Sequence, residues 1–376
     1  MLDLGTFGPG ARAARFLADY GARMIRVEPS RGPGSVQLPF YAYGAWRGFE
    51  RCRIDLKDAD GLTAVLDLAA RADVIIEGFR PGVADRLGVG YAAVSERNPG
   101  VVYCAATGYG QTGPYAGWAG HDLNYLAVGG YLHTGGRDAR GVPALPGATI
   151  ADSAGGGLHA AMAIMSGLLG RAATGTGCYL DVAATDGVLG LMSMNLDEYL
   201  ATGAIPGPGH GVLTGRYACY GVYECADGRF LAVGAIESKF FANLCRELGL
   251  SDWVSRQYED GAQDELAGAL RTVFAQRARD EWISLLAHLD ACVAPVLSVD
   301  ELPMDPQVEA RGVVTTTRHP NRGEFASVGP VWAGTARADH PYAVAGDGET
   351  STSRILSEIG YSEDRISDLA ARGIVA

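Results

Sequence analysis

The chain has 376 residues, of which 48% are hydrophobic and 20% charged, and its formal net charge is −12. This length exceeds what one hydrophobic core usually supports, so we expect two lobes of an ordinary soluble globular protein. The acidic balance argues against nucleic acid or an anionic membrane as the main partner, although a local arginine cluster could still hold an anionic ligand.

The N-terminal part alternates short apolar runs with helical segments. The predicted strands cover residues 1–5, 24–27, 51–56, 74–76 and 101–105, and the predicted helices cover residues 11–20 and 59–71. Strand–helix alternation at this spacing predicts a parallel α/β sheet.

A helix is predicted at residues 157–169, with Asp152 and Ser153 as candidate caps. Residues 201–216 hold five glycines and two prolines, which indicates a linker. A hairpin follows at residues 217–235, turned at Asp227-Gly228. The remaining predicted elements are helices at 239–248, 264–275, 280–289 and 352–360, with a proline-bearing return at 294–312.

Seven scattered cysteines form no CxxC pair, which is typical of reduced thiols in a cytoplasm. The N-terminus shows no secretory signal pattern, and no stretch reaches the roughly 18 uninterrupted apolar residues of a membrane span. We therefore expect a cytoplasmic protein that does not enter a membrane. No metal site is recognisable.

A glycine-rich segment at residues 108–113 matches the GxGxxG pattern after a predicted strand. Dinucleotide binding would need a helix to begin there and an acidic residue at the ribose distance, and neither follows. A glycine-rich loop is the better interpretation.

Two arginines, Arg80 and Arg86, follow the predicted strand at 74–76. Ligands bind at the carboxyl ends of strands in a parallel sheet, where such arginines could form charge-assisted hydrogen bonds to a phosphate. A pair of solvated surface arginines is the alternative, and the spacing alone favours it.

Three further residues suggest acid–base chemistry. His121 has a side chain that titrates near neutrality, and a carboxylate could fix its tautomer. Asp152 is a helix cap by default, but the N–H groups of residues 153–157 could also face a developing oxyanion, with glycines admitting a ligand closely. Glu237 follows a predicted strand and would otherwise be a surface carboxylate.

Several segments together resemble the family III CoA-transferases (the CaiB/BaiF superfamily), and within them the α-methylacyl-CoA racemase branch. These segments are LADYGARMIRVEP (17–29), ADVIIEGFRPGVADRLGVGY (72–91), NPGVVYCAATGYGQTGPYAGWAGHDLNYLA (98–127), ATIADSAGGG (148–157) and VGAIESKFF (233–241). The match continues through IDLKDADG (54–61), RDEW (279–282) and APVLSVDELPMDPQVEARG (294–312).

The resemblance implies an α/β fold: a Rossmann-like large domain and a smaller α+β domain in an interlocked homodimer. The implied boundaries are 1–200 for the large domain, 201–216 for the linker, 217–325 for the small domain and 326–376 for a C-terminal segment returning to the large domain. His121 and Asp152 would come from one subunit and Glu237 from its partner.

The resemblance also implies a substrate, an acyl-CoA thioester, with no separate cofactor. His121, oriented by Glu237, would remove the α-proton from one face while protonated Asp152 delivers a proton to the other, and N–H donors at residues 152–157 would stabilise the enolate. The residues implied to hold the CoA moiety are Asp55, Leu56, Lys57, Gly78, Phe79, Arg80, Arg86, Gly120, Asp122, Asn124 and Tyr125.

The chain departs from the racemase pattern at Ser153, where phenylalanine is usual, at Ser238, where proline is usual, and in the stretch around Arg47. These changes bear on the acyl group and on the adenine-end contacts. Two alternatives remain: a CoA-transferase in which Asp152 is the acyl-carrying nucleophile, and a catalytically silent CoA-binding protein.

Overall fold

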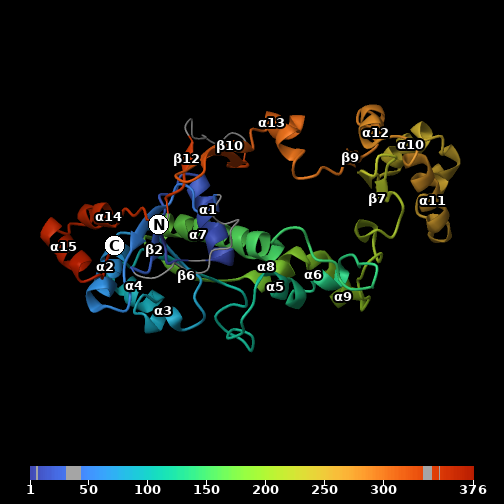
Figure 1. Ribbon diagram of the computed structural model, residues 1–376. Helices are drawn as coiled ribbons and strands as arrows, with labels where there is room; N and C mark the ends of the chain where they lie inside the picture. The colour runs from blue at the N-terminus through green and yellow to red at the C-terminus, as the bar shows by residue number, and fades with distance from the viewer. Residues whose placement is uncertain (6, 31–43, 333–340, 347) are drawn as a thin grey trace. The chain divides into compact units, whose positions relative to one another are not determined.

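The computed structural model describes residues 1–5, 7–30, 44–332, 341–346 and 348–376 (Figure 1). Its contacts divide the chain into two compact units. Unit 1 comprises Met1–Tyr131, Pro146–Ser193 and Pro306–Ala376, and unit 2 comprises Leu132–Leu145 and Met194–Asp305.

These units differ from the expected domains at three places. Residues 132–145, which were expected in the large domain, belong to unit 2. Unit 2 starts again at Met194, so it includes the last residues expected in the large domain and the expected linker, and the chain re-enters unit 1 at Pro306 instead of at residue 326. The last difference has a physical cause, because the Arg47 guanidinium donates to the Ser327 hydroxyl and the Val328 carbonyl. These contacts tie the hairpin before residue 329 to unit 1.

Unit 1 contains a parallel sheet of six strands in the order β3-β2-β1-β4-β5-β6. The strands are β1 (Leu2–Asp3), β2 (Ile25–Glu28), β3 (Glu50–Arg53), β4 (Val74–Glu77), β5 (Val102–Thr107) and β6 (Cys178–Ala183). The first five confirm the predicted strands, while β6 was not predicted. The order matches that of a doubly wound nucleotide-binding sheet.

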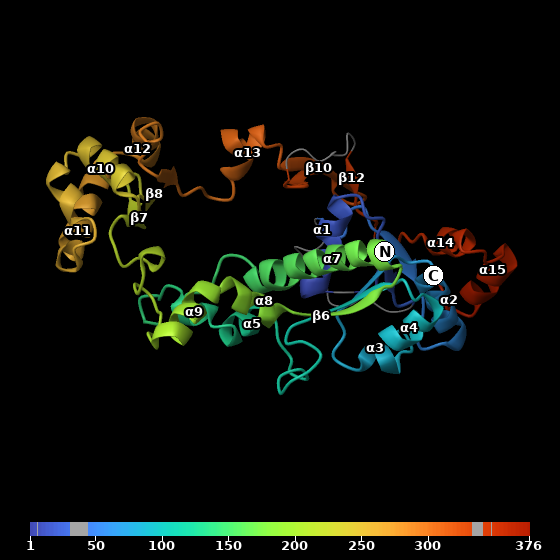
Figure 2. The same cartoon turned by 180° about the vertical axis from the view of Figure 1, so that it is seen from behind.

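Helices cover both faces of this sheet (Figures 1 and 2). One face packs against α1 (Gly8–Asp19) and α7 (His159–Thr174). The other packs against α2 (Ala59–Ala69), α4 (Tyr91–Arg97), α14 (Thr352–Glu358) and α15 (Glu363–Ala371). Side chains of a strand alternate between faces, so Val74 and Ile76 join the first core and Ile75 the second.

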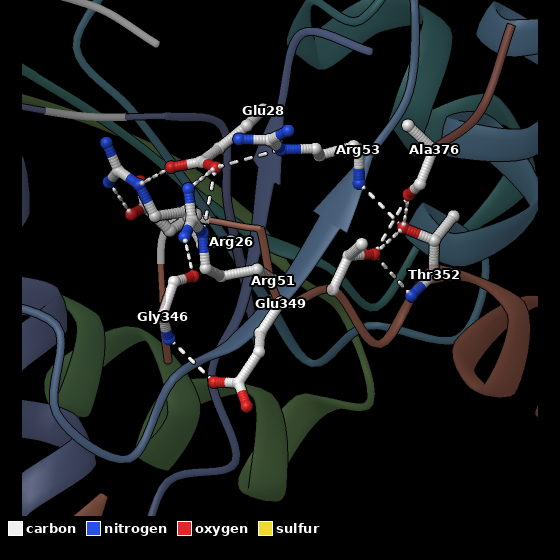
Figure 3. Close-up of polar contacts among 10 residues, drawn as sticks. Arg26, Glu28, Arg51, Arg53, Gly346, Glu349, Thr352 and Ala376 are labelled. Atoms are coloured by element: carbon white, nitrogen blue, oxygen red, sulfur yellow. Dashed lines mark hydrogen bonds and ion pairs between the residues drawn. The ribbon is translucent and has the colours of Figure 1, made fainter. Parts of the chain in front are cut away.

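Polar contacts fasten the C-terminal segment to β2 and β3 (Figure 3). Arg51 donates to the Glu28 carboxylate at 2.8 Å and to the Gly346 carbonyl at 2.8 Å. The Arg53 N–H donates to the Thr352 hydroxyl at 2.9 Å. The helices at the end of the chain therefore belong to the layer that covers one face of the sheet formed by the first strands.

A second, small sheet also belongs to unit 1. Strand β10 (Val314–His319) pairs antiparallel with β11 (Gly323–Val328) and parallel with β12 (Tyr342–Ala343). The other helices of unit 1 are α3 (Val83–Arg86), α5 (Asp122–Val128), η2 (Ala151–Leu158), α8 (Ala184–Leu191) and α13 (Pro306–Ala310).

Unit 2 contains the predicted hairpin, in which β7 (Tyr220–Glu224) pairs antiparallel with β8 (Phe230–Gly234), and β9 (Val293–Pro295) extends the sheet. Its core is formed with three helices that were also predicted: α10 (Ser238–Glu247), α11 (Gln263–Phe274) and α12 (Arg279–Leu286). The helix α9 (Ser193–Thr202) starts at the unit boundary. Among the described residues, no helix combines the length and apolar character needed to cross a membrane.

Candidate active site

Most of the predicted site residues of unit 1 follow the carboxyl ends of strands of the parallel sheet. Residues 55–57 follow β3, residues 78–80 follow β4, and the loop that contains His121 follows β5. The strand order changes direction between β1 and β4, and ligands of doubly wound sheets bind at such a point. The fold therefore supports a ligand site at this edge.

Asp152 does not cap a helix, contrary to the sequence-based prediction. The helix begins at Ala151 with a π-helical segment, η2, that continues directly into α7. π-helical turns leave a helix locally wider and are frequent at functional sites. Asp152 therefore lies within the first turn, where its side chain is 9% exposed.

Three glycines of η2 allow the neighbouring helices to pack closely against it. A Cβ on Gly156 would lie 2.5 Å from Pro9 of α1, and one on Gly155 would lie 2.8 Å from the Ala184 carbonyl of α8. A Cβ on Gly157 would lie 2.5 Å from the Cβ of Arg12. The glycines therefore admit neighbouring helices, whereas the sequence analysis expected them to admit a ligand.

Two of the N–H groups that were expected to stabilise an oxyanion are already hydrogen-bonded within the protein. The Asp152 N–H donates to the Asp122 carboxylate at 2.8 Å, and the Ser153 N–H donates to the Thr149 carbonyl at 3.0 Å. These two N–H groups are therefore already satisfied within unit 1, and the prediction that they face a ligand oxygen is wrong for this structure.

The Asp152 carboxyl has an environment suited to proton transfer. Its pKa is raised from 3.8 to about 6: burial and, after it, the Asp122 carboxylate raise the pKa, and positive charge on Arg12 and His121 opposes the rise. Within the described residues, no hydrogen bond is made to its carboxylate oxygens. A group with such a pKa can both donate and accept a proton near neutrality.

His121 is the exposed residue that precedes α5. Its backbone N–H donates to the Asn124 side-chain oxygen at 3.0 Å, which fixes the entry into the helix. The Tyr125 hydroxyl donates to the Gly120 carbonyl at 2.5 Å. Asn124, Tyr125 and Gly120 therefore build the loop that presents His121, and their expected contact with CoA stays a prediction.

Asp122 joins the two candidate acid–base residues. It follows His121 directly, and its carboxylate accepts the Asp152 N–H. Its negative charge also contributes to the raised pKa of Asp152. The contact of Asp122 with CoA stays a prediction. The structure adds a contact that the sequence did not reveal, because the Asp122 carboxylate holds the backbone of Asp152 across the packing of α5 against η2.

Glu237 lies in unit 2, at the end of β8 and directly before α10. It is exposed, and Gln257 holds the preceding backbone by donating to the Ala235 carbonyl at 3.0 Å and the Ile236 carbonyl at 2.8 Å. Gln257 is itself 4% exposed. The pairing of Glu237 with His121 stays a prediction, because the two residues belong to different units.

Two of the expected CoA-binding loops are held by their own side chains. The Lys57 N–H donates to the Asp55 carboxylate at 2.9 Å, which closes the turn around Leu56 after β3. The Phe79 N–H donates to the Glu77 carboxylate at 2.7 Å, leaving Gly78 exposed between them. Burial raises the pKa of Glu77 to about 7, although this hydrogen bond opposes the rise.

Arg80 and Arg86 are both exposed, and neither forms an ion pair with any residue that the structure describes. Arg80 lines a pocket of about 180 Å³ together with residues of β4–β6, α3 and α4, among them the carboxyl groups of Glu77 and Asp85. The role of Arg80 and Arg86 in holding the CoA moiety stays a prediction.

Two other sequence interpretations can be compared with the structure. The segment Gly108–Gly113 forms a loop after β5 with no helix at its end, which confirms the glycine-rich loop. Arg47 is 1% exposed and donates to the Asp19 carboxylate at 2.9 Å, so it has a structural role in unit 1.

Comparison with known proteins agrees with this architecture. The family model for CoA-transferase family III matches residues 1–343. An alpha-methylacyl-CoA racemase from Homo sapiens is 33% identical over 377 aligned residues, covering 100% of this chain and 96% of that protein. A succinyl-CoA:glutarate CoA-transferase, also from Homo sapiens, is 30% identical and covers 100% of this chain and 88% of that protein.

The same similarity extends to a solved structure. The crystal structure of a CAIB/BAIF family protein from Brucella suis superimposes with a TM-score of 0.79 at 27% identity, covering 95% of this chain and 97% of that one. The resemblance seen in the sequence segments is therefore confirmed at the level of the whole chain. With its doubly wound sheet and a family match over most of its length, the chain belongs to CoA-transferase family III.

Proposed function

We propose that this protein is an acyl-CoA racemase or epimerase that inverts the α-carbon of a 2-methylacyl-CoA by 1,1-proton transfer. The observation that carries the proposal is the buried Asp152 carboxyl, whose pKa is raised to about 6 and which lies within electrostatic range of His121. Support also comes from the identity of 33% to a racemase along the whole chain.

The reaction begins with removal of the α-proton, which is acidic because the carbanion delocalises onto the thioester oxygen as an enolate. His121 takes this proton from one enantiomer, and protonated Asp152 returns a proton to the opposite face. The reverse direction exchanges the two roles. The N–H groups of Asp152 and Ser153 are not part of this proposal as enolate donors, because both are hydrogen-bonded within unit 1.

Glu237 is proposed to orient His121 across an interlocked homodimer. This arrangement makes a distinct prediction for coexpressed variants. A His121→Ala chain and a Glu237→Ala chain, each inactive as a homodimer, form a mixed dimer in which one site has both native residues. Recovered activity supports the shared site; the same mixture without activity, or a monomer by sedimentation, contradicts it.

The decisive experiment incubates the protein with one enantiomer of a 2-methylacyl-CoA in heavy water, with no acid acceptor. The proposal expects deuterium at the α-carbon together with the opposite enantiomer. His121→Ala and Asp152→Ala should each remove inversion, and a retained exchange from one enantiomer in either variant would assign the faces.

A CoA-transferase is the second candidate, favoured by the identity of 30% to a succinyl-CoA:glutarate CoA-transferase. There the Asp152 carboxylate attacks the thioester carbonyl, which gives an acyl–aspartyl anhydride and CoA thiolate. The thiolate attacks the aspartyl carbonyl, so that the donor acid leaves and an aspartyl-CoA thioester forms. The acceptor carboxylate then attacks this thioester to form a second anhydride, and the released thiolate attacks its acyl carbonyl to give the new acyl-CoA and free Asp152. Transfer upon addition of a free acid, with no α-exchange in its absence, would replace the racemase proposal with this one. A silent CoA-binding protein predicts binding with neither reaction.

A further inference from the structure

Tyr109 carries a hydroxyl group that lies close to the loop of His121. It belongs to the glycine-rich loop after β5, and its side chain is half-buried. The start of this loop is fixed, because the Gly108 carbonyl accepts hydrogen bonds from the Thr185 N–H at 3.0 Å and the Thr185 hydroxyl at 2.8 Å. Among the residues that the structure describes, none forms a hydrogen bond with the Tyr109 hydroxyl. This hydroxyl can therefore bind a ligand.

The ring of Tyr109 is held by other aromatic rings. It meets Tyr125 edge to face, with ring centroids 5.0 Å apart, and makes similar contacts with Tyr115 at 6.1 Å and with Trp118 at 6.2 Å. Edge-to-face pairs of this kind each stabilise by about 0.5–1.5 kcal/mol beyond the burial of area. The three contacts restrict the ring, so the hydroxyl has a defined position before any ligand binds.

Two glycines allow these rings to approach the loop of His121. A Cβ on Gly120 would lie 3.0 Å from the Tyr109 hydroxyl and 2.7 Å from the Tyr125 ring, and a Cβ on Gly108 would lie 2.1 Å from the Tyr125 ring. Gly120 directly precedes His121. The Tyr109 hydroxyl therefore lies against the backbone that presents the candidate base, and Gly108 makes room for Tyr125.

Tyr125 connects this hydroxyl with the second acid–base residue. Burial first, and then interactions with Asp152, Tyr109 and Asp122, raise the pKa of Tyr125 to about 12. Tyr125 therefore lies within electrostatic range of both Asp152 and Tyr109. Its own hydroxyl donates to the Gly120 carbonyl, so it also contacts the loop of His121. One tyrosine ring thus separates the Tyr109 hydroxyl from the two candidate acid–base groups.

We propose, resting on the proposed function, that the Tyr109 hydroxyl donates a hydrogen bond to the thioester oxygen and stabilises the enolate. Negative charge develops on this oxygen when His121 removes the α-proton, and a fixed donor is most effective at such a position. The N–H groups of Asp152 and Ser153 are hydrogen-bonded within unit 1 and do not supply this donor.

The hydroxyl keeps its proton during the reaction. Burial raises the pKa of Tyr109 above its ordinary value of 10.0, so the tyrosine is a weaker acid than in water. The enolate oxygen is therefore hydrogen-bonded and not protonated, and the proton that completes the inversion comes from Asp152.

The first test measures α-exchange of one enantiomer of a 2-methylacyl-CoA in heavy water. Tyr109→Phe removes the hydroxyl and keeps the ring contacts, so we expect kcat for exchange to fall about 100-fold or more, with KM nearly unchanged. Tyr179→Phe makes the same chemical change on β6, at a side chain that is 41% exposed, and it should leave kcat as it is.

The second test needs no turnover. It follows the carbonyl stretch of bound 2-methylpropanoyl-CoA, isotopically labelled at the thioester carbon, by infrared difference spectroscopy. This thioester has no stereocentre at its α-carbon, so inversion does not change it. A hydrogen bond weakens the C=O bond, so we expect the stretch at a higher frequency in Tyr109→Phe than in the native protein and in Tyr179→Phe.

An unchanged carbonyl frequency in Tyr109→Phe overturns the proposal, and so does an unchanged kcat. The two proposals also fail separately. A carbonyl frequency that depends on Tyr109 in a protein without α-exchange supports the donor and refutes the racemase. Rapid α-exchange that Tyr109→Phe leaves intact supports the racemase and refutes the donor.

Discussion

Replacing Asp152 by asparagine should stabilise the protein at alkaline pH, because the native carboxyl is buried in a place that disfavours its charge. Its pKa is raised from 3.8 to about 6 by burial first and by Asp122 second. The unfolded chain releases this proton near pH 4, whereas the folded chain holds it to about pH 6. The native protein therefore loses stability as the pH rises through that window.

The magnitude follows from the pKa difference. A gap of about two pKa units corresponds to about 3 kcal/mol. The new amide must be buried in the same place, where an imperfect set of hydrogen bonds offsets about 1 kcal/mol. We expect Asp152→Asn to be more stable than the native protein by about 2 kcal/mol at pH 8, and less stable by about 0.5 kcal/mol at about pH 4, where the cost of the amide exceeds the small ionisation penalty that remains.

Thermal unfolding across this pH range measures the effect. For a unit of this size, 2 kcal/mol corresponds to an increase in Tm of about 4–8 °C at pH 8. Glu96→Gln, which makes the same chemical change at an exposed position of α4, is the matched control and should not shift Tm in a pH-dependent way. A stabilisation of equal size at both ends of the range, or a loss at pH 8, would refute the reasoning.

Two further predictions concern the same region. Gly156→Ala should destabilise unit 1 by about 2–4 kcal/mol in urea unfolding, since the new Cβ would lie 2.5 Å from Pro9. Gly170→Ala is the control: its Cβ would meet nothing within 4 Å, so this variant should be as stable as the native protein or more stable. Asp122→Asn removes a negative charge that raises the pKa of Asp152. For the enantiomer whose conversion needs protonated Asp152, kcat/KM should therefore begin to fall at a pH lower by about half a unit to one unit. An unchanged pH profile would show that Asp122 does not affect the pKa of Asp152.

Much of the fold could be predicted from local patterns. Strands β4 and β5 are short, mostly apolar runs because their residues are buried on both faces of a parallel sheet. Strand β6 was missed because its residues alternate between half-buried and exposed positions and resemble a surface segment. The order of the strands in the sheet could not be predicted from these local patterns, because it depends on pairing between segments that are far apart in the chain.

The candidate site, like the fold, could be predicted only in part from the sequence. Residue type and the family segments were enough to select His121, Asp152 and Glu237 as candidates, because imidazole and carboxyl groups can transfer protons and the resemblance assigns them that role. The role of Asp122 was not visible, since its contact with Asp152 spans 30 positions along the chain. The position of Asp152 inside a π-helical turn was not visible either, because helix capping rules treat a helix as if it had no neighbours.

Local chemistry thus identified the first five strands, the hairpin of β7 and β8, several helices and the candidate acid–base residues, because these depend on side-chain type and on spacing within a few turns. Packing settled what those residues can do. The raised pKa of Asp152 arises from burial and from Asp122, and the glycines of η2 serve the approach of α1 and α8. Burial, charge and close packing depend on segments far apart in the chain, and such proximity exists only in the folded molecule.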